Sequence, residues 1–219
     1  MDVVFFLLEI FGVVAFALSG VLVAIKKEMD VFGGCVLGMI TATCGGLIRD
    51  LILGINPPNV FINPTPAIIS IAVSIFAYLP FMQRFFTHKH KVYDLVLFVT
   101  DSVGLGVFTV IGANICFQTL VSPNMFTVVC LATITGVGGS VTRDVLSLSI
   151  PRIFVKNFYA SACILGGVAY YLLFIYWSTL GATIISVLLI FALRICASIF
   201  RWELPKPLKL KKEETNKGI

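Results

Sequence analysis

The sequence predicts an all-α integral membrane protein, and three observations carry this prediction. Of the 219 residues, 58% are hydrophobic and only 12% are charged, and the mean hydropathy is +1.02. A water-soluble domain of this size does not have so apolar a composition. The apolar residues form seven runs, which approach or exceed the roughly 20 residues that a helix needs to cross a bilayer. A motif of two adjacent glycines followed by Arg-Asp also occurs twice, which indicates a duplicated unit.

Seven predicted spans follow one another along the chain, separated by short loops. The segment before the first span lacks the basic region and the cleavage site of a signal peptide, so we expect this span to remain in the mature protein. We expect one transmembrane domain over residues 1–200 and a basic cytoplasmic tail over residues 201–219. The spans are Val3–Ile25, Val31–Leu53, Ala67–Met82, Val92–Leu120, Met125–Leu148, Phe158–Tyr176 and Thr179–Phe200.

The loops predict the orientation of the protein in the membrane. Lys and Arg occur in the loops after spans one, three and five and in the tail, whereas the loops after spans two, four and six contain neither. Because basic loops stay on the cytoplasmic side, we expect the N-terminus outside and the C-terminus in the cytoplasm. The tail either binds anionic lipid headgroups or is a solvated segment that fixes the topology. We expect no nucleic-acid partner.

The duplicated motif predicts inverted repeats. Its two copies read ITATCGGLIRD and ITGVGGSVTRD, and the second follows the first by 94 positions. Further upstream the spacing is 92, and there Glu9 pairs with Asp101. Because each copy contains three spans, an odd number, the second copy enters the membrane the other way round. We expect repeats over about residues 3–82 and 92–176, with the seventh helix (about 179–200) packed outside the pair.

The first helix of each repeat carries Gly, Phe and Gly at four-residue steps, which places them on one face. Small residues on such a face let two helices approach closely. We interpret these glycines as packing residues rather than as contacts of a permeating species. They are Gly12, Phe16 and Gly20 in the first repeat and Gly104, Phe108 and Gly112 in the second.

The paired glycines lie in the middle of the second and fifth spans. Gly45-Gly46 and Gly138-Gly139 each invite a kink or an unwound turn, because glycine costs about 1 kcal/mol relative to alanine in a helix. We expect helices two and five to be broken there. Two breaks related by inversion indicate a central polar pathway. The alternative is a kink that serves only packing.

Arg and Asp inside a membrane need partners or water, because each costs at least about 2.5 kcal/mol near the bilayer centre. The topology places Glu9 near the first Arg-Asp pair in the outer half of the membrane and Asp101 near the second in the inner half. We therefore expect two symmetry-related clusters, each lining a vestibule. The alternative is a pair of structural salt bridges that hold helices in register. The clusters are Glu9, Arg49 and Asp50, and Asp101, Arg143 and Asp144.

The remaining polar residues do not indicate catalysis. Neither a hydrolytic triad nor a phosphate-binding loop is present, since GGLIRD lacks the lysine and the spacing of a P-loop. The six cysteines lie singly in apolar runs, and His88 and His90 have no acidic or cysteine ligand nearby. We expect no enzyme activity, no cofactor and no metal site beyond a transported cation.

The two motifs, the inverted three-helix repeats and the seventh helix resemble the prokaryotic trimeric intracellular cation (TRIC) channels over Val3–Phe200. In that family the motif is commonly three glycines, two variable residues and Arg-Asp. Here the glycine triplets read Cys44-Gly45-Gly46 and Gly138-Gly139-Ser140, each with one glycine replaced. The resemblance implies a prokaryotic inner-membrane homotrimer with one pore per protomer, lined by helices two and five. Such channels pass monovalent cations, potassium foremost.

A pore flanked by two arginines needs neutralising carboxylates before a cation can use it. Glu9, Asp50, Asp101 and Asp144 would have this role. Hydroxyl groups and backbone carbonyls would then meet the ion. The candidate hydroxyl residues are Ser19, Thr41, Thr43 and Thr135.

The same broad bacterial family includes members described as carriers of small amino acids, glycine among them, and this is the alternative function. Inverted repeats with broken helices are also typical of secondary transporters. An arginine suits a substrate carboxylate better than it suits potassium. A third hypothesis is a structural membrane protein without transport activity.

Overall fold

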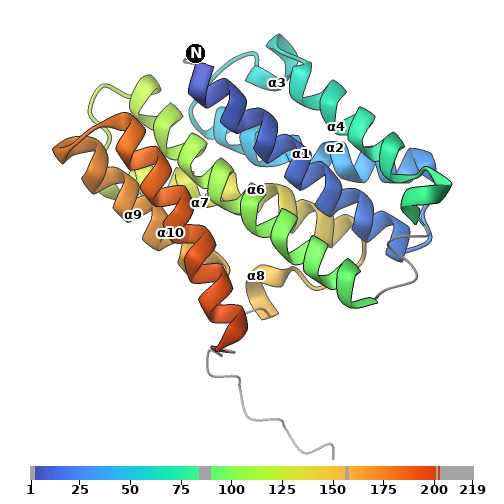
Figure 1. Cartoon of the computed structure of the whole chain (residues 1–219). Helices are drawn as coiled ribbons and strands as arrows, with labels where there is room; N and C mark the ends of the chain where they lie inside the picture. Colours follow the sequence, from blue (N-terminus) through green and yellow to red (C-terminus); the bar gives the residue numbers. More distant parts are fainter. Residues whose placement is uncertain (1–2, 84–89, 156–157, 201, 203–219) are drawn as a thin grey trace, which may run out of the picture.

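The computed structural model describes residues 3–83, 90–155, 158–200 and 202, and the regular elements in this part of the chain are all helices (Figure 1). The first repeat contains α1 (Val3–Lys26), α2 (Val31–Ile52), α3 (Asn59–Ile62) and α4 (Thr65–Ala77), and the second contains α6 (His90–Thr119), α7 (Met125–Leu146), α8 (Arg152–Val155) and α9 (Ala160–Tyr176), followed by α10 (Thr179–Ile199). The loop around His88 and the basic tail lie outside the described residues, apart from Trp202.

Five of the described helices are long and apolar enough to cross a membrane, namely α1, α2, α6, α7 and α10. The third and sixth predicted spans are shorter helices of 13 and 17 residues. At about 1.5 Å per residue they measure roughly 20 and 26 Å. Helix α4 ends at Ala77, before the expected boundary at Met82, because Pro80 lacks an amide hydrogen and disfavours helix at the residue before it. Residues 80–83 are helical again after this interruption.

Equivalent helices of the two repeats begin and end in the same way. Asp30 caps α2 by accepting a 2.7 Å hydrogen bond from the Gly33 amide, and Asn124 caps α7 by accepting a 2.8 Å hydrogen bond from the Thr127 amide. Asn124 follows Asp30 by 94 positions, the spacing of the motif. The N-terminal boundary of these two helices is therefore encoded locally, by a side chain that accepts an otherwise unpaired amide hydrogen.

The expected breaks at the paired glycines are absent, since α2 and α7 are helical without interruption across Gly45-Gly46 and Gly138-Gly139. The glycines instead lie where α2 and α7 cross. A Cβ on Gly45 would collide with the carbonyl oxygen of Thr135, and a Cβ on Gly139 would collide with that of Thr41. The repeat relates these two contacts to each other, since Gly139 is the equivalent of Gly45 and Thr135 that of Thr41. The glycines therefore allow two helix backbones to touch, and the helices need not unwind.

The first helices of the repeats, α1 and α6, also pack against each other. The rings of Phe16 and Phe108 stack at 5.2 Å between centroids and 16° between planes. A Cβ on Gly104 would collide with the Phe16 ring, and one on Gly12 would lie 2.6 Å from Val107. Since Phe16 and Phe108 are repeat equivalents, their contact lies on the approximate two-fold axis between the repeats. The packing interpretation of these residues agrees with the structure.

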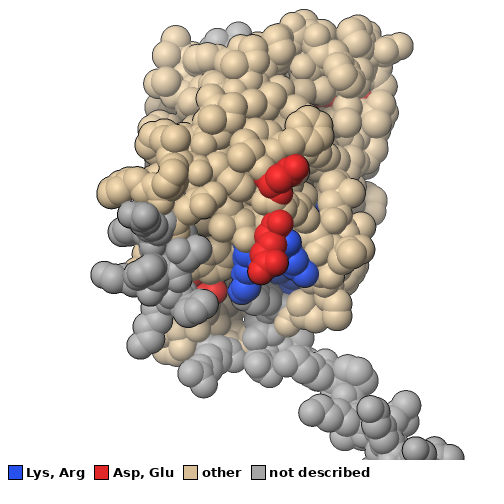
Figure 2. All heavy atoms as spheres, turned by 90° about the vertical axis from the view of Figure 1, so that its right-hand side faces the viewer, with Lys and Arg blue, Asp and Glu red and all other residues tan. Residues whose placement is uncertain are grey.

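Helix α10 packs on α6 and α9, outside the pair of first helices (Figure 1). Much of the outer surface is apolar, and in the face that Figure 2 shows, charged side chains gather in one small region of its lower half. Exposed aromatic side chains lie at both ends of the bundle, with Tyr176 and Trp177 at one end and Phe200 and Trp202 at the other. This distribution is typical of a multi-pass membrane protein.

Candidate functional site

The first Arg-Asp pair lies beside a cavity of about 500 Å³. Nε and Nη2 of Arg49 donate to Oδ1 of Asp50 at 2.8 and 2.7 Å. Oδ2 of Asp50 accepts from the amide of Asn59, the first residue of α3, at 2.8 Å. Asp50 therefore neutralises its neighbouring arginine and also holds the short helix that follows the span.

Glu9 lines the same cavity as Arg49 and Asp50, as the sequence predicts. It is half-buried, and no hydrogen bond or ion pair joins it to another residue of the described part. Most other polar residues of the lining carry amides or hydroxyls. They are Thr43, Asn59, Asn63, Asn114, Gln118 and Thr119.

The second Arg-Asp pair repeats this geometry, and the residues of both pairs are buried. Nε and Nη2 of Arg143 lie 2.8 Å from Oδ1 of Asp144, whose Oδ2 accepts from the amide of Arg152 at 3.0 Å. Arg143 also donates through Nη1 to Oδ1 of Asp101 at 2.8 Å, and to the hydroxyl of Ser19. The side chains of Arg143 and Asp101 are fully buried. The structure thus brings Asp101, Arg143 and Asp144 together, and neither Asp101 nor Arg143 lines one of the two cavities.

Two arginines outside the predicted set complete this second cluster. Arg152 of α8 and Arg194 of α10 each place a guanidinium nitrogen 3.6 Å from Oδ2 of Asp101. Three guanidinium groups (Arg143, Arg152, Arg194) therefore surround two carboxylates (Asp101, Asp144), and the cluster carries one formal positive charge. Arg194 could have been found from the sequence, because it is an ionisable residue inside a predicted span. Arg152 had no such signal, since it belongs to a basic loop.

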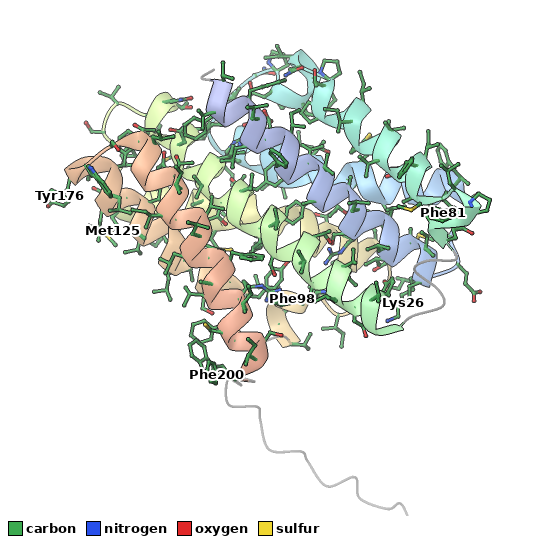
Figure 3. The ribbon with its side chains drawn as sticks, viewed as in Figure 1. Lys26, Phe81, Phe98, Met125, Tyr176 and Phe200 are labelled. Atoms are coloured by element: carbon green, nitrogen blue, oxygen red, sulfur yellow. The ribbon has the colours of Figure 1, made fainter. Side chains whose placement is uncertain are left out.

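Aromatic rings and a hydroxyl hold Arg194 in place. Its guanidinium carbon lies 4.4 Å from the centroid of the Tyr159 ring and 5.2 Å from that of Phe98, and its Nε donates to the Ser102 hydroxyl at 3.3 Å. Figure 3 labels Phe98 beside the lower part of α10. The seventh helix packs on α6 and α9 of the second repeat and inserts a charge between them.

The four candidate hydroxyl residues have different surroundings. Thr41 and Thr135 are buried and donate to the carbonyls of Leu37 and Leu131, both at 2.6 Å. Ser19 joins the second cluster, where its hydroxyl donates to Asp101 at 3.3 Å. Thr43 donates to the Met39 carbonyl at 2.8 Å and lines the large cavity. Of the four, Thr43 is thus the residue with an oxygen next to open space.

The residues that replace glycine in the two triplets also contact helix neighbours. Sγ of Cys44 lies 3.3 Å from Oγ1 of Thr142 on α7. Ser140 is buried and donates to the Val137 carbonyl at 2.8 Å. Gly46 lines the large cavity, whereas Gly138 would place a Cβ 3.0 Å from the Gly45 Cα. The two triplets therefore lie at the packed crossing of α2 and α7. Gly46 also lines the large cavity.

A second cavity, of about 310 Å³, lies at the opposite end of the bundle. Lys26, Lys27, Asp144 and Arg152 line it, and Nζ of Lys26 lies 5.2 Å from the centroid of the Tyr93 ring. Figure 3 shows Lys26 and Phe200 at the far side of the molecule from Met125 and Tyr176. Within the described ranges, no group of three or more His, Cys, Asp or Glu residues is arranged to hold a metal ion.

Comparison with known proteins places the chain in a family. The family model described as Glycine transporter matches residues 6–81 and 98–174, and these two segments fall within the two predicted repeats. The chain is 37% identical over 200 residues to the UPF0126 inner membrane protein YadS of Escherichia coli K12, with 91% of this chain and 93% of that protein covered. It is 32% identical over 203 residues to the UPF0126 membrane protein YvgT of Bacillus subtilis, with coverage of 91% and 94%.

Two solved structures share the fold. A crystal structure of a prokaryotic TRIC channel in 0.5 M KCl is 33% identical, has a TM-score of 0.84 and covers 93% of this chain and 100% of its own. The TRIC trimeric intracellular cation channel orthologue from Rhodobacter sphaeroides is 30% identical, with a TM-score of 0.83 and coverage of 92% and 100%. Sequence, fold and paired Arg-Asp motifs thus agree: the chain is a multi-pass membrane protein of the UPF0126 family, the family of the prokaryotic TRIC cation channels.

Proposed function

We propose that this protein is a homotrimeric channel for monovalent cations, potassium foremost, with one pathway in each protomer. The charge of the large cavity carries the proposal. Arg49 is neutralised by Asp50 at 2.7 Å, and Glu9 adds a carboxylate that has no ion pair within the described part. One guanidinium and two carboxylates leave a formal charge of −1. A cavity of this sign with low-dielectric walls concentrates cations.

The pathway we propose runs from the large cavity, past the crossing of α2 and α7, to the cavity beside Lys26. Thr43, Cys44 and Gly46 would line its first part, and five long helices with the two shorter ones, α4 and α9, would make up seven spans. The likeness to solved cation channels at 30% identity or more supports this assignment. In our proposal the end of the bundle with Lys26 and Lys27 faces the cytoplasm, because basic residues stay on that side.

The test is to reconstitute the purified protein in planar bilayers with a potassium gradient. Discrete current steps that reverse near the potassium equilibrium potential are the expected result. Bilayers that stay silent with protein of verified trimeric assembly would refute the channel. The same preparation in vesicles supports a parallel uptake measurement.

A carrier of a small amino acid such as glycine is the second candidate. Glu9 and Arg49 line one cavity, and this pair of opposite charges would match the ammonium and carboxylate groups of a zwitterion. The description of the matching family model also names glycine. Saturable uptake of labelled glycine without unitary currents would favour the carrier, whereas currents that glycine does not alter would favour the channel.

A further inference from the structure

The two repeats differ in how they expose equivalent carboxylates. Glu9 and Asp101 are repeat equivalents at a spacing of 92. Glu9 borders the cavity of about 500 Å³, whereas the side chain of Asp101 is fully buried. In the proposed pathway, Glu9 belongs to the large cavity at one end and Asp101 lies beside the cavity at the other end, through Arg152. The pathway is therefore open at the Glu9 end and closed at the Asp101 end.

The residue that closes the Asp101 end is Arg152. It lines the cavity of about 310 Å³ beside Lys26 and Lys27, and its Nη1 lies 3.6 Å from Oδ2 of Asp101. Its side chain is 17% exposed, whereas that of Asp101 is 0% exposed. The guanidinium of Arg152 therefore lies between the open space of this cavity and the buried carboxylate.

The first repeat has no equivalent of this side chain. The position 94 residues before Arg152 is Pro58, which has no charge and no amide hydrogen. In the first repeat, the amide that donates to the motif carboxylate therefore belongs to the next residue, Asn59. It donates to Oδ2 of Asp50 at 2.8 Å. The two repeats thus keep the same backbone contact, and the second repeat adds a charged side chain at the same place.

The contacts of Arg152 would allow its side chain to rotate while its backbone remains in place. Its amide is held by Asp144 at 3.0 Å. Its guanidinium approaches Asp101 only to 3.6 Å, beyond hydrogen-bonding distance. By contrast, Arg143 makes 2.8 Å contacts with both Asp101 and Asp144. Rotation of the Arg152 side chain would give up one ion pair and leave the helices in place.

Arg194 keeps the cluster intact when Arg152 leaves. It remains 3.6 Å from Asp101 and is fixed between the rings of Tyr159 and Phe98. With Arg152 in place, three guanidinium groups face two carboxylates, and the formal charge is +1. Without it, Arg143 and Arg194 balance Asp101 and Asp144, and the cluster is neutral. Withdrawal of Arg152 therefore removes both a physical obstruction and the positive charge that repels a cation.

We propose that Arg152 is the gate at the Lys26 end of the pathway, with Arg194 as the fixed charge that keeps Asp101 paired while the gate is open. The proposal rests on the proposed cation-channel function. Motion of one side chain on a short helix between two spans would switch access to Asp101 from the cavity.

The first test is the open probability of single channels in potassium chloride. We expect Arg152→Gln and Arg152→Met, which keep most of the side-chain volume without the charge, to raise the open probability about threefold or more. Arg152→Lys, which keeps a positive charge, should stay near the unmodified protein. Lys27→Gln is the matched control, because it removes the same charge from the same cavity without contacting Asp101. The proposal is overturned if Lys27→Gln raises the open probability as much as Arg152→Gln does. It is also overturned if neither Arg152→Gln nor Arg152→Met changes the open probability.

The second test measures access without current. Ser19, a buried partner of Asp101 and Arg143, is replaced by cysteine (Ser19→Cys) in a background without the six native cysteines. A membrane-impermeant cationic thiol reagent is then added at the Lys26 side. We expect Arg152→Gln to accelerate labelling about tenfold. Lys27→Gln, which changes the charge of the cavity but leaves Arg152 in place, should accelerate it much less.

The two tests separate this proposal from the channel function. If the unmodified protein conducts but Arg152→Gln changes neither open probability nor labelling, the gate is wrong and the channel stands. If neither the unmodified protein nor any variant conducts but Arg152→Gln still accelerates labelling, the channel is wrong and Arg152 still controls access to Asp101. Labelling that Arg152→Gln does not accelerate overturns the gate in either case.

Discussion

Single residues decide how charge is distributed inside this protein. Asp101 accepts from Arg143 at 2.8 Å and lies 3.6 Å from two further arginines. Three guanidinium groups in an apolar environment depend on this carboxylate, since a buried charge without a partner is strongly destabilising. Glu9, its equivalent in the first repeat, borders a cavity and has no ion pair in the described ranges. Equivalent acidic residues therefore have different surroundings, a cluster of arginines in the second repeat and a cavity in the first.

The substitution Asp101→Asn should destabilise the protein by about 3 kcal/mol or more, because it leaves three guanidinium groups near a neutral amide. The measurement is the thermal unfolding midpoint of the purified protein, together with its assembly state on a sizing column. Glu9→Gln is the control, since it also removes a carboxylate from a predicted span and breaks no ion pair that the structure describes. A midpoint that is equally low in both variants would contradict the difference in roles.

The substitution Glu9→Gln should instead lower the potassium conductance in dilute salt about two- to fivefold, because the large cavity loses its net negative charge. The difference should narrow near 1 M ionic strength, where the screening length falls to about 3 Å. Asp94→Asn removes an exposed acidic residue outside the cavity and should leave the conductance unchanged. A conductance loss that does not depend on salt would argue against an electrostatic effect.

At the scale of whole helices, the crossing of α2 and α7 organises the protein. Gly45 faces the Thr135 carbonyl, and Gly139 faces the Thr41 carbonyl, with the two contacts related by the repeat. The neighbouring Gly46 is less crowded, since a Cβ there would lie in ordinary van der Waals contact, 3.5 Å from the end of the Arg49 side chain. Adjacent glycines in one motif therefore differ in whether a side chain would fit.

Gly45→Ala should destabilise the protein by about 1–3 kcal/mol, because a methyl group at this position must push two helix backbones apart. Gly46→Ala should be neutral or slightly stabilising, since alanine favours helix by about 1 kcal/mol and the Arg49 side chain can adjust. Thermal unfolding of both variants in detergent checks this difference. If the glycines served as hinges of broken helices, both alanine variants would affect the protein alike.

At the scale of the whole molecule, the apolar surface and the two polar ends define how the protein lies in a membrane. Lys26 and Lys27 line the cavity at one end, whereas the loop between α6 and α7 is at the other end and contains no basic residue. Because basic residues remain on the cytoplasmic side, the two ends should react with impermeant reagents from opposite sides.

Cysteines introduced by Lys27→Cys and Val121→Cys, each in a background without native cysteines, test this orientation. Both positions are exposed in the structure. An impermeant thiol reagent should label the Val121→Cys protein in intact cells and the Lys27→Cys protein only in inverted membrane vesicles. The reverse pattern would place the N-terminus in the cytoplasm and invert the proposed direction of the pathway.

Features that depend on local chemistry and on composition could be predicted from the sequence alone. Long apolar runs predict most of the spans, because helices in lipid must satisfy their own backbone hydrogen bonds. Asp30 and Asn124 accept amide hydrogens at the starts of equivalent helices. The repeat also groups Glu9 with Arg49 and Asp101 with Arg143; in the structure the first two line one cavity and the second two form an ion pair at 2.8 Å. These outcomes follow from residues close in sequence or from the symmetry of a duplicated chain.

Features that depend on which residues meet across helices required the three-dimensional structure. Whether Gly45 breaks its helix or lets α7 pack closely against it depends on the Thr135 carbonyl, which lies 90 positions away in the chain. The burial of Asp101, and the convergence of Arg152 and Arg194 upon it, likewise depend on α8 and on the unpaired α10. A repeat pattern predicts equal sites, and the two sites differ because a seventh helix and one arginine have no counterpart in the first repeat.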